Sequence, residues 1–127
     1  MSKHNLPRPT DAELAILRVL WQRGPSTVRQ VLEDLGENTG YTTVLKFMQI
    51  MTEKGLLRRD ARDRTHVYEA ELPEETTRRQ LVNHLLERAF GGSAKKLVMQ
   101  ALSTKKASRE ELAEIRSLLD KMQGGGK

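Results

Sequence analysis

The chain has 127 residues, enough for one ordinary domain or two small ones, and its net charge of +5 permits a nucleic-acid partner. It has no cysteine, which excludes disulfides, thiolate metal sites and cysteine redox chemistry. No apolar run approaches the ~18 residues of a membrane span, and residues 1–7 contain no apolar signal segment, so we expect a cytoplasmic protein.

The basic residues are unevenly distributed. Residues 1–72 carry 11 Lys/Arg and 10 Asp/Glu, a net charge of +1, whereas residues 73–127 carry 11 and 7, a net charge of +4. The densest basic cluster in the first half runs from Lys54 to Arg64, with five basic and two acidic residues. The overall charge is therefore weak support for DNA binding, and this local cluster must carry that argument.

The first predicted helix follows a polar, proline-containing lead-in over residues 1–9 that we expect to be flexible. Thr10 and Glu13 have the spacing of a capping box, so the helix should begin there and run to about Gln22, before the break at Gly24. The stripe expected to face the core consists of Leu14, Leu17 and Trp21, with Leu20 beside it.

A second, short helix is predicted over residues 28–35. Ser26 and Thr27 precede it as candidate capping residues, and the turn over residues 36–40 is rich in helix breakers. The side chains expected to point inward are Val28, Val31, Leu32 and Leu35.

The third predicted helix lies between Gly40 and Gly55. One face carries Val44, Met48 and Met51 at the i, i+4, i+7 spacing of a buried stripe. A different face carries the polar residues Thr42, Thr43, Lys46 and Gln49. Small polar groups near the start of a seated helix suit the DNA major groove, although a solvated amphipathic helix is an equally good interpretation of this segment alone.

A change to two-residue periodicity predicts two strands over residues 56–61 and 65–72, joined by residues 62–64. A charged hairpin tip is often simply solvated. After three helices, however, the hairpin looks like a wing, and Arg62 and Arg64 are placed to reach phosphate or the minor groove.

Three more helices are predicted over residues 74–90, 93–102 and 108–122, and residues 124–127 form a frayed tail. The order predicts a mainly α protein with a small β-hairpin: a winged helix-turn-helix at residues 10–72, then a three-helix dimerisation region at residues 73–123. A core of about 50 residues is marginal alone, so we expect a second copy of the chain to complete it. The residues expected at that interface are Leu81, Leu85, Phe90, Leu97, Leu112, Ile115 and Leu119.

The sequence contains no recognisable catalytic constellation. His4, His66 and His84 are far apart and form no HxxxH or HExxH pair, and no glycine-rich phosphate loop is present. We therefore predict neither an enzyme nor a metal or other cofactor.

Several segments resemble one known family. The recognition-helix segment Tyr41-Thr42-Thr43-Val44, with Lys54-Gly55-Leu56 at its end, is similar to that of the penicillinase-repressor and methicillin-resistance-repressor (BlaI/MecI-type) family of winged-helix regulators. Agreement extends to three further places: Glu13, Leu17 and Leu20-Trp21; Ser26-Thr27-Val28 with Val31; and Phe90-Gly91-Gly92 with Leu97-Val98. The similarity covers about residues 8–122.

The resemblance implies a homodimeric repressor that binds a palindromic DNA operator. It places base contacts at Thr42, Thr43 and Lys46. It also gives Leu45 a position that is basic in some relatives, where an apolar contact to a thymine methyl would replace the charge. The residues expected to contact the DNA backbone are Ser26, Thr27, Tyr41, Gln49, Arg62 and Arg64.

The resemblance also implies a mode of regulation. Many family members pair with a membrane β-lactam sensor that is itself a metalloprotease, and cleavage in the C-terminal part ends repression. The best-known members are cut at an Asn-Phe bond, whereas this chain has Gln100-Ala101 at the matching place. The cysteine cluster of the copper-responsive relatives is absent here.

An alternative from another functional class is a winged-helix adaptor that binds protein. The near-neutral charge of residues 1–72 is its main support.

Overall fold

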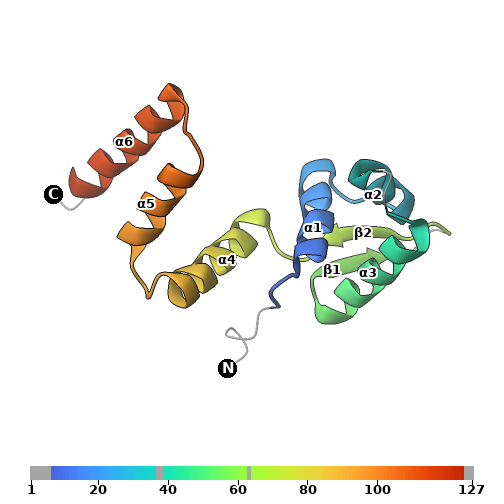
Figure 1. The fold of residues 1–127 in the computed structure, drawn as a ribbon. Helices are drawn as coiled ribbons and strands as arrows, with labels where there is room; N and C mark the ends of the chain where they lie inside the picture. The colour runs from blue at the N-terminus through green and yellow to red at the C-terminus, as the bar shows by residue number, and fades with distance from the viewer. Residues whose placement is uncertain (1–6, 37–38, 63, 125–127) are drawn as a thin grey trace. The chain divides into compact units, whose positions relative to one another are not determined.

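The computed structural model describes residues 7–36, 39–62 and 64–124. The element order confirms the prediction of a mainly α protein with one small β-hairpin (Figure 1). The elements are α1 (Asp11–Arg23), α2 (Val28–Leu35), α3 (Tyr41–Lys54), β1 (Leu57–Asp60), β2 (Val67–Ala70), α4 (Glu74–Ala89), α5 (Ala94–Thr104) and α6 (Arg109–Gly124). Most of the predicted lead-in and tail, at residues 1–6 and 125–127, lies outside the described residues.

The chain forms two compact units that divide between Val82 and Asn83, inside α4. The predicted boundary between Leu72 and Pro73 lies earlier in the chain. The first turns of α4 belong to the first unit, where Thr77 is buried with 2% of its surface exposed. The second unit contains the rest of α4 together with α5 and α6.

Hydroxyl side chains define the starts of the first two helices. At α1, Thr10 Oγ1 accepts a hydrogen bond from the Glu13 N–H (3.2 Å) and the Glu13 carboxylate accepts one from the Thr10 N–H (3.0 Å), which confirms the predicted capping box. At α2, Thr27 and Gln30 form a second capping box of the same kind. Each box satisfies two backbone donors that the first helical turn would otherwise leave unpaired.

Helix α3 has the limits and the buried face that its periodicity predicts. Gly40 is its N-cap, and Gly55 ends it in the left-handed conformation (φ 87°), where the Gly55 N–H donates to the last-turn carbonyls. Val44, Met48 and Met51 are each 0% exposed. Because this stripe is completely buried, the rotation of α3 about its own axis is fixed.

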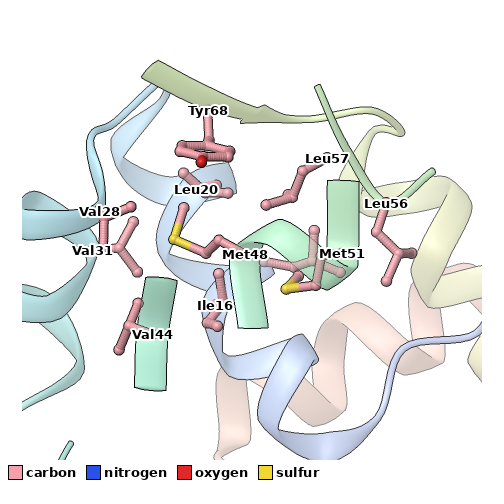
Figure 2. Packing of buried hydrophobic residues seen from close by; sticks show 11 residues of the cluster. Ile16, Leu20, Val28, Val31, Val44, Met48, Met51, Leu56, Leu57 and Tyr68 are labelled. Carbon is pink, nitrogen blue, oxygen red and sulfur yellow. The ribbon is translucent and has the colours of Figure 1, made fainter. Parts of the chain in front are cut away.

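The apolar core of the first unit is built from α1, α2, α3 and the hairpin (Figure 2). Its members are Ile16, Leu17, Leu20, Val28, Val31, Val44, Met48, Met51, Leu56, Leu57 and Tyr68. The predicted stripe of α1 was partly wrong. Ile16 is buried, whereas Leu14 is only half-buried and Trp21 packs at the edge, where its indole N–H donates to the Leu72 carbonyl (3.0 Å).

The hairpin is antiparallel, with Leu57 opposite Ala70 and Asp60 opposite Val67, and both strands are shorter than predicted. A third chain segment pairs with it. The Ser26 N–H donates to the Tyr68 carbonyl (2.9 Å) and the Tyr68 N–H donates to the Ser26 carbonyl (2.8 Å). This pair of bonds fixes the hairpin next to the start of α2.

One ion pair joins the first turn of α1 to the last turn of α3. Lys54 Nζ lies 2.8 and 2.9 Å from the two carboxylate oxygens of Glu13, a residue that is only 3% exposed. Burial on its own raises the pKa of the Glu13 carboxyl, but the hydrogen bonds from Lys54 and Thr10 outweigh it and hold the pKa below 4.5. The carboxylate therefore stays ionised at neutral pH and positions both helices.

Replacing Met48 with Ala should lower the free energy of unfolding by about 2–5 kcal/mol, because the change leaves a cavity against α1 and α2. Urea denaturation followed by the fluorescence of Trp21, the only tryptophan, measures this effect. The neighbouring exposed position provides the control, since Gln49→Ala should change the free energy by less than about 0.5 kcal/mol. Equal losses for the two variants would contradict the orientation of α3.

Replacing Glu13 with Gln should lower the free energy of unfolding by about 1 kcal/mol at neutral pH. The pKa of Glu13 is lowered in the folded chain from its ordinary value of 4.5, so ionisation of Glu13 stabilises the fold above pH 4.5. This contribution is lost as the pH falls through the lowered pKa. The difference between the wild type and Glu13→Gln should therefore shrink in acid, as urea denaturation over a pH series can measure. The exposed Glu53→Gln serves as a control, and a pH-independent difference for Glu13→Gln would refute this account.

Candidate nucleic-acid interface

The face of α3 opposite its buried stripe is polar and exposed. Thr42, Thr43, Lys46 and Gln49 all lie exposed on it. Lys46 and Gln49 are three residues apart and are therefore neighbours on the helix surface. Thr42 and Lys46, which are four residues apart, are neighbours for the same reason. The structure thus brings the predicted base-contact residues together on one surface. Their contact with DNA stays a prediction.

Ile50 is an exposed apolar side chain on the same face, which the sequence analysis did not single out. It is 37% exposed and lies four residues beyond Lys46 and seven beyond Thr43. An isoleucine in this place offers methyl groups where the surrounding residues offer hydrogen bonds. The signal was present in the sequence, because Ile50 does not share the spacing of Val44, Met48 and Met51.

Leu45 does not occupy the exposed face. It is partly buried and packs against the apolar core, so it is poorly placed for the expected contact with a thymine methyl. Ile50 is the better candidate for an apolar contact from α3.

The arginines of the hairpin differ in their partners. Arg62, with a side chain that is 89% exposed, is bound to Asp60, with Nη2 2.6 Å from one carboxylate oxygen. The hydrogen bonds from the Arg62 side chain and backbone lower the pKa of Asp60 to about 2. Arg58 forms ion pairs with Glu69 on β2 and with Glu71, which follows that strand. Arg64 is exposed and has no ion-pair partner within the described part of the chain.

Ser26, which was predicted to contact phosphate, lies inside the first unit and is poorly placed for that contact. The residue is 1% exposed, and its hydroxyl donates to the Gly24 carbonyl (2.8 Å). The reason is its backbone pairing with Tyr68, which buries Ser26 between the hairpin and the start of α2. Thr27, its neighbour, is half-buried and provides the cap of α2 instead.

A cleft of about 500 Å³ lies where the starts of α2 and α3 meet the hairpin loop. Its described polar lining residues are Thr27, Arg29, Tyr41, Arg64, Thr65, His66 and Tyr68. The Arg29 guanidinium lies 5.0 Å from the centre of the Tyr41 ring, a cation–π arrangement that holds Arg29 at the cleft. Thr27, Tyr41 and Arg64 are predicted from the sequence to contact the DNA backbone, whereas Arg29 and His66 are brought to the same cleft only by the fold.

The described residues contain no group of three or more His, Cys, Asp or Glu side chains that could hold a metal ion. Every buried side-chain nitrogen and oxygen among them has a hydrogen-bond partner. None of the described helices is both long and apolar enough to cross a membrane.

The second unit exposes its apolar side chains. Neither α5 nor α6 contains a buried residue. Of the residues predicted at a dimer interface, Leu85, Leu112 and Leu119 are 45%, 41% and 55% exposed. The other four are half-buried, namely Phe90, Leu97 and Ile115 of the second unit and Leu81, which belongs to the first.

The predicted cleavage pair lies within α5. Gln100 and Ala101 are exposed, and the Gln100 side-chain amide donates to Thr104 Oγ1 (3.0 Å). The Gln100 carbonyl also accepts a hydrogen bond from the Ser103 hydroxyl (3.1 Å).

Comparison with known proteins gives consistent matches. The family described as Penicillinase repressor matches residues 9–121. The chain is 23% identical over 117 residues to the penicillinase repressor of Bacillus licheniformis, and the match covers 91% of each chain. It is 41% identical over 66 residues to the transcriptional regulator BlaI of Mycobacterium tuberculosis, a match that covers 50% of this chain and 48% of that protein.

Proposed function

The chain belongs to the penicillinase repressor family, a family of transcriptional repressors and not of enzymes, and we propose that it represses transcription as a homodimer on a palindromic DNA operator. The observation that carries this proposal is the exposed polar face of α3, opposite the three side chains that are completely buried. A helix held so firmly by one face can insert the other into the major groove without reorienting.

We assign recognition of the DNA sequence to the exposed face of α3. Lys46 suits the acceptor edge of guanine, and Thr42 and Thr43 can each hydrogen-bond a base edge or contact a thymine methyl. Ile50 adds an apolar contact on the same face. The backbone contacts that we retain from the sequence analysis are Thr27, Tyr41, Gln49, Arg62 and Arg64.

Dimerisation is assigned to the second unit. Leu112, Leu118 and Leu119 on α6 are 41–55% exposed in the single chain, and a unit of this size is too small to support a large core of its own. A second copy would bury these residues in an isologous interface. Such a dimer presents two α3 helices, which suits half-sites about one or two helical turns apart.

Relief of repression by proteolysis completes the proposal. The Gln100–Ala101 bond lies in α5, so a cut there would separate α6 from the DNA-binding unit. A protease needs an extended substrate, and α5 lacks buried side chains in the single chain, so its local unfolding costs little. We assign the cut to a membrane sensor-protease, the partner that the family resemblance implies.

The double variant Thr43→Ala, Lys46→Ala should bind about a hundredfold more weakly to an operator that the wild type selects from a random duplex pool, because two base contacts are lost. Fluorescence anisotropy gives both affinities. Thr104→Ala, Lys105→Ala makes the same chemical changes on the second unit and should bind as the wild type does. Wild-type affinity and selectivity in the first double variant would show that α3 does not read the operator.

The same titration tests the adaptor alternative. If the wild-type dimer binds no duplex even at low salt, a protein-binding adaptor becomes the better interpretation, since the near-neutral first half would then have no nucleic-acid role.

Sedimentation at micromolar concentration should give a mass of twice 14.5 kDa for the wild type. Leu119→Glu should shift the protein to the monomer, because it introduces a charge into the expected apolar interface. Ser117→Glu adds the same charge at a polar position of α6 and should remain dimeric. A monomeric wild type would remove the dimer from the proposal.

A further inference from the structure

The cleft beside α3 has three walls from different parts of the chain. Arg29 comes from α2, Tyr41 from the first turn of α3, and Arg64 and His66 from the loop before β2. Its volume of about 500 Å³ is ample for a phosphate group with part of its sugar. The cleft therefore adjoins the start of the helix that we assign to the major groove.

Among the described residues that line the cleft, the charged side chains are all basic. Arg29 from α2 and Arg64 from the loop are permanent cations, and His66 can become one. Tyr41 from α3 and Tyr68 from β2 contribute phenol groups, and no carboxylate is among the described lining residues. Asp60, Glu69 and Glu71, the carboxylates that pair with hairpin arginines among the described residues, are absent from this lining.

We infer that this cleft binds one backbone phosphate of the DNA and that His66 makes the binding proton-linked. The inference rests on the proposed function and deepens it, because it adds Arg29 and His66 to the interface and predicts a dependence on pH. The ligand is a phosphodiester, an anion without sequence information, so the cleft contributes affinity and register to every duplex.

The geometry favours this occupant for two reasons. Arg29 is already stacked on Tyr41, so less side-chain freedom is lost when its guanidinium meets a phosphate. The cations approach from two sides, from α2 and from the loop, and can contact different oxygens of one phosphate.

The direction of the pH effect follows from the charge of the ligand. Protonated imidazole carries a positive charge and donates from both ring nitrogens, so a phosphate stabilises it. Binding should then take up a proton from solvent and return it on release. Affinity for DNA should rise as the pH falls from about 8 to about 6, the range in which histidine changes its charge.

The experiment uses the full chain with His4→Gln and His84→Gln, so that His66 is the only imidazole. A fluorescein-labelled duplex of mixed sequence is the probe, because a phosphate contact does not depend on sequence. Anisotropy gives the affinity across the pH range, and calorimetry in two buffers of different ionisation enthalpy gives the protons taken up.

The parent protein, which retains His66, should bind the duplex about three- to tenfold more tightly at pH 6 than at pH 8. Binding should take up a fraction of a proton near neutrality. Adding His66→Gln should give weak binding, and adding His66→Lys strong binding, each with little pH dependence. Arg29→Ala should weaken binding and reduce the proton uptake, since the phosphate would be held less closely to His66.

The outcomes separate the two proposals. If the parent protein binds neither the mixed-sequence duplex nor the operator selected above, the proposed function fails. If it binds duplex but His66→Gln keeps the same affinity, pH profile and proton uptake, DNA binding stands and the role of His66 is overturned. If Arg29→Ala also binds as the parent does, the phosphate site itself is overturned. Unfolding curves from Trp21 fluorescence verify that each variant is folded.

Discussion

The seating of α3 on α1 and α2 is the constraint on which the DNA-facing surface depends. Val44, Met48 and Met51 are completely buried, so every other position on the helix has its direction set by the 3.6-residue repeat. At the end of the helix, Lys54 is held by the buried carboxylate of Glu13, which also caps α1. Apolar packing thus fixes the rotation of α3, and one ion pair fixes its far end.

Local pattern predicted the buried face of α3, where Val44, Met48 and Met51 share one helical spacing. It was only partly right in α1, where it included the buried Leu17 but not Ile16. Ile16 and Val19 are apolar as well as Leu14 and Leu17, so several stripes are compatible with the sequence. Which of them is buried depends on contacts with α3 and the hairpin, which are distant in sequence. The extent of each strand was also overestimated, since β-propensity continues beyond the residues that find a pairing partner.

In the candidate site too, the features set within one helix could be predicted, and those set by contacts between distant segments could not. The exposed face of α3 was predictable because its residues belong to one helix. The burial of Ser26 was not, because it results from pairing with Tyr68, 42 positions away by the residue numbers. Arg29 and His66 are likewise unremarkable in sequence. They become neighbours of one cleft only after the hairpin folds back against the start of α2.

The pair formed by Arg62 and Asp60 affects how the hairpin would respond to salt. An arginine that neutralises a DNA phosphate displaces a condensed cation into bulk solution, and the entropy of that release drives binding. Arg62 is already paired with an anion of its own chain, the Asp60 carboxylate, whose oxygen lies 2.6 Å from Arg62 Nη2. The pair has no net charge, so docking it against DNA displaces little from the ion atmosphere. The arginines counted in the hairpin therefore overstate the number of ions that binding sets free.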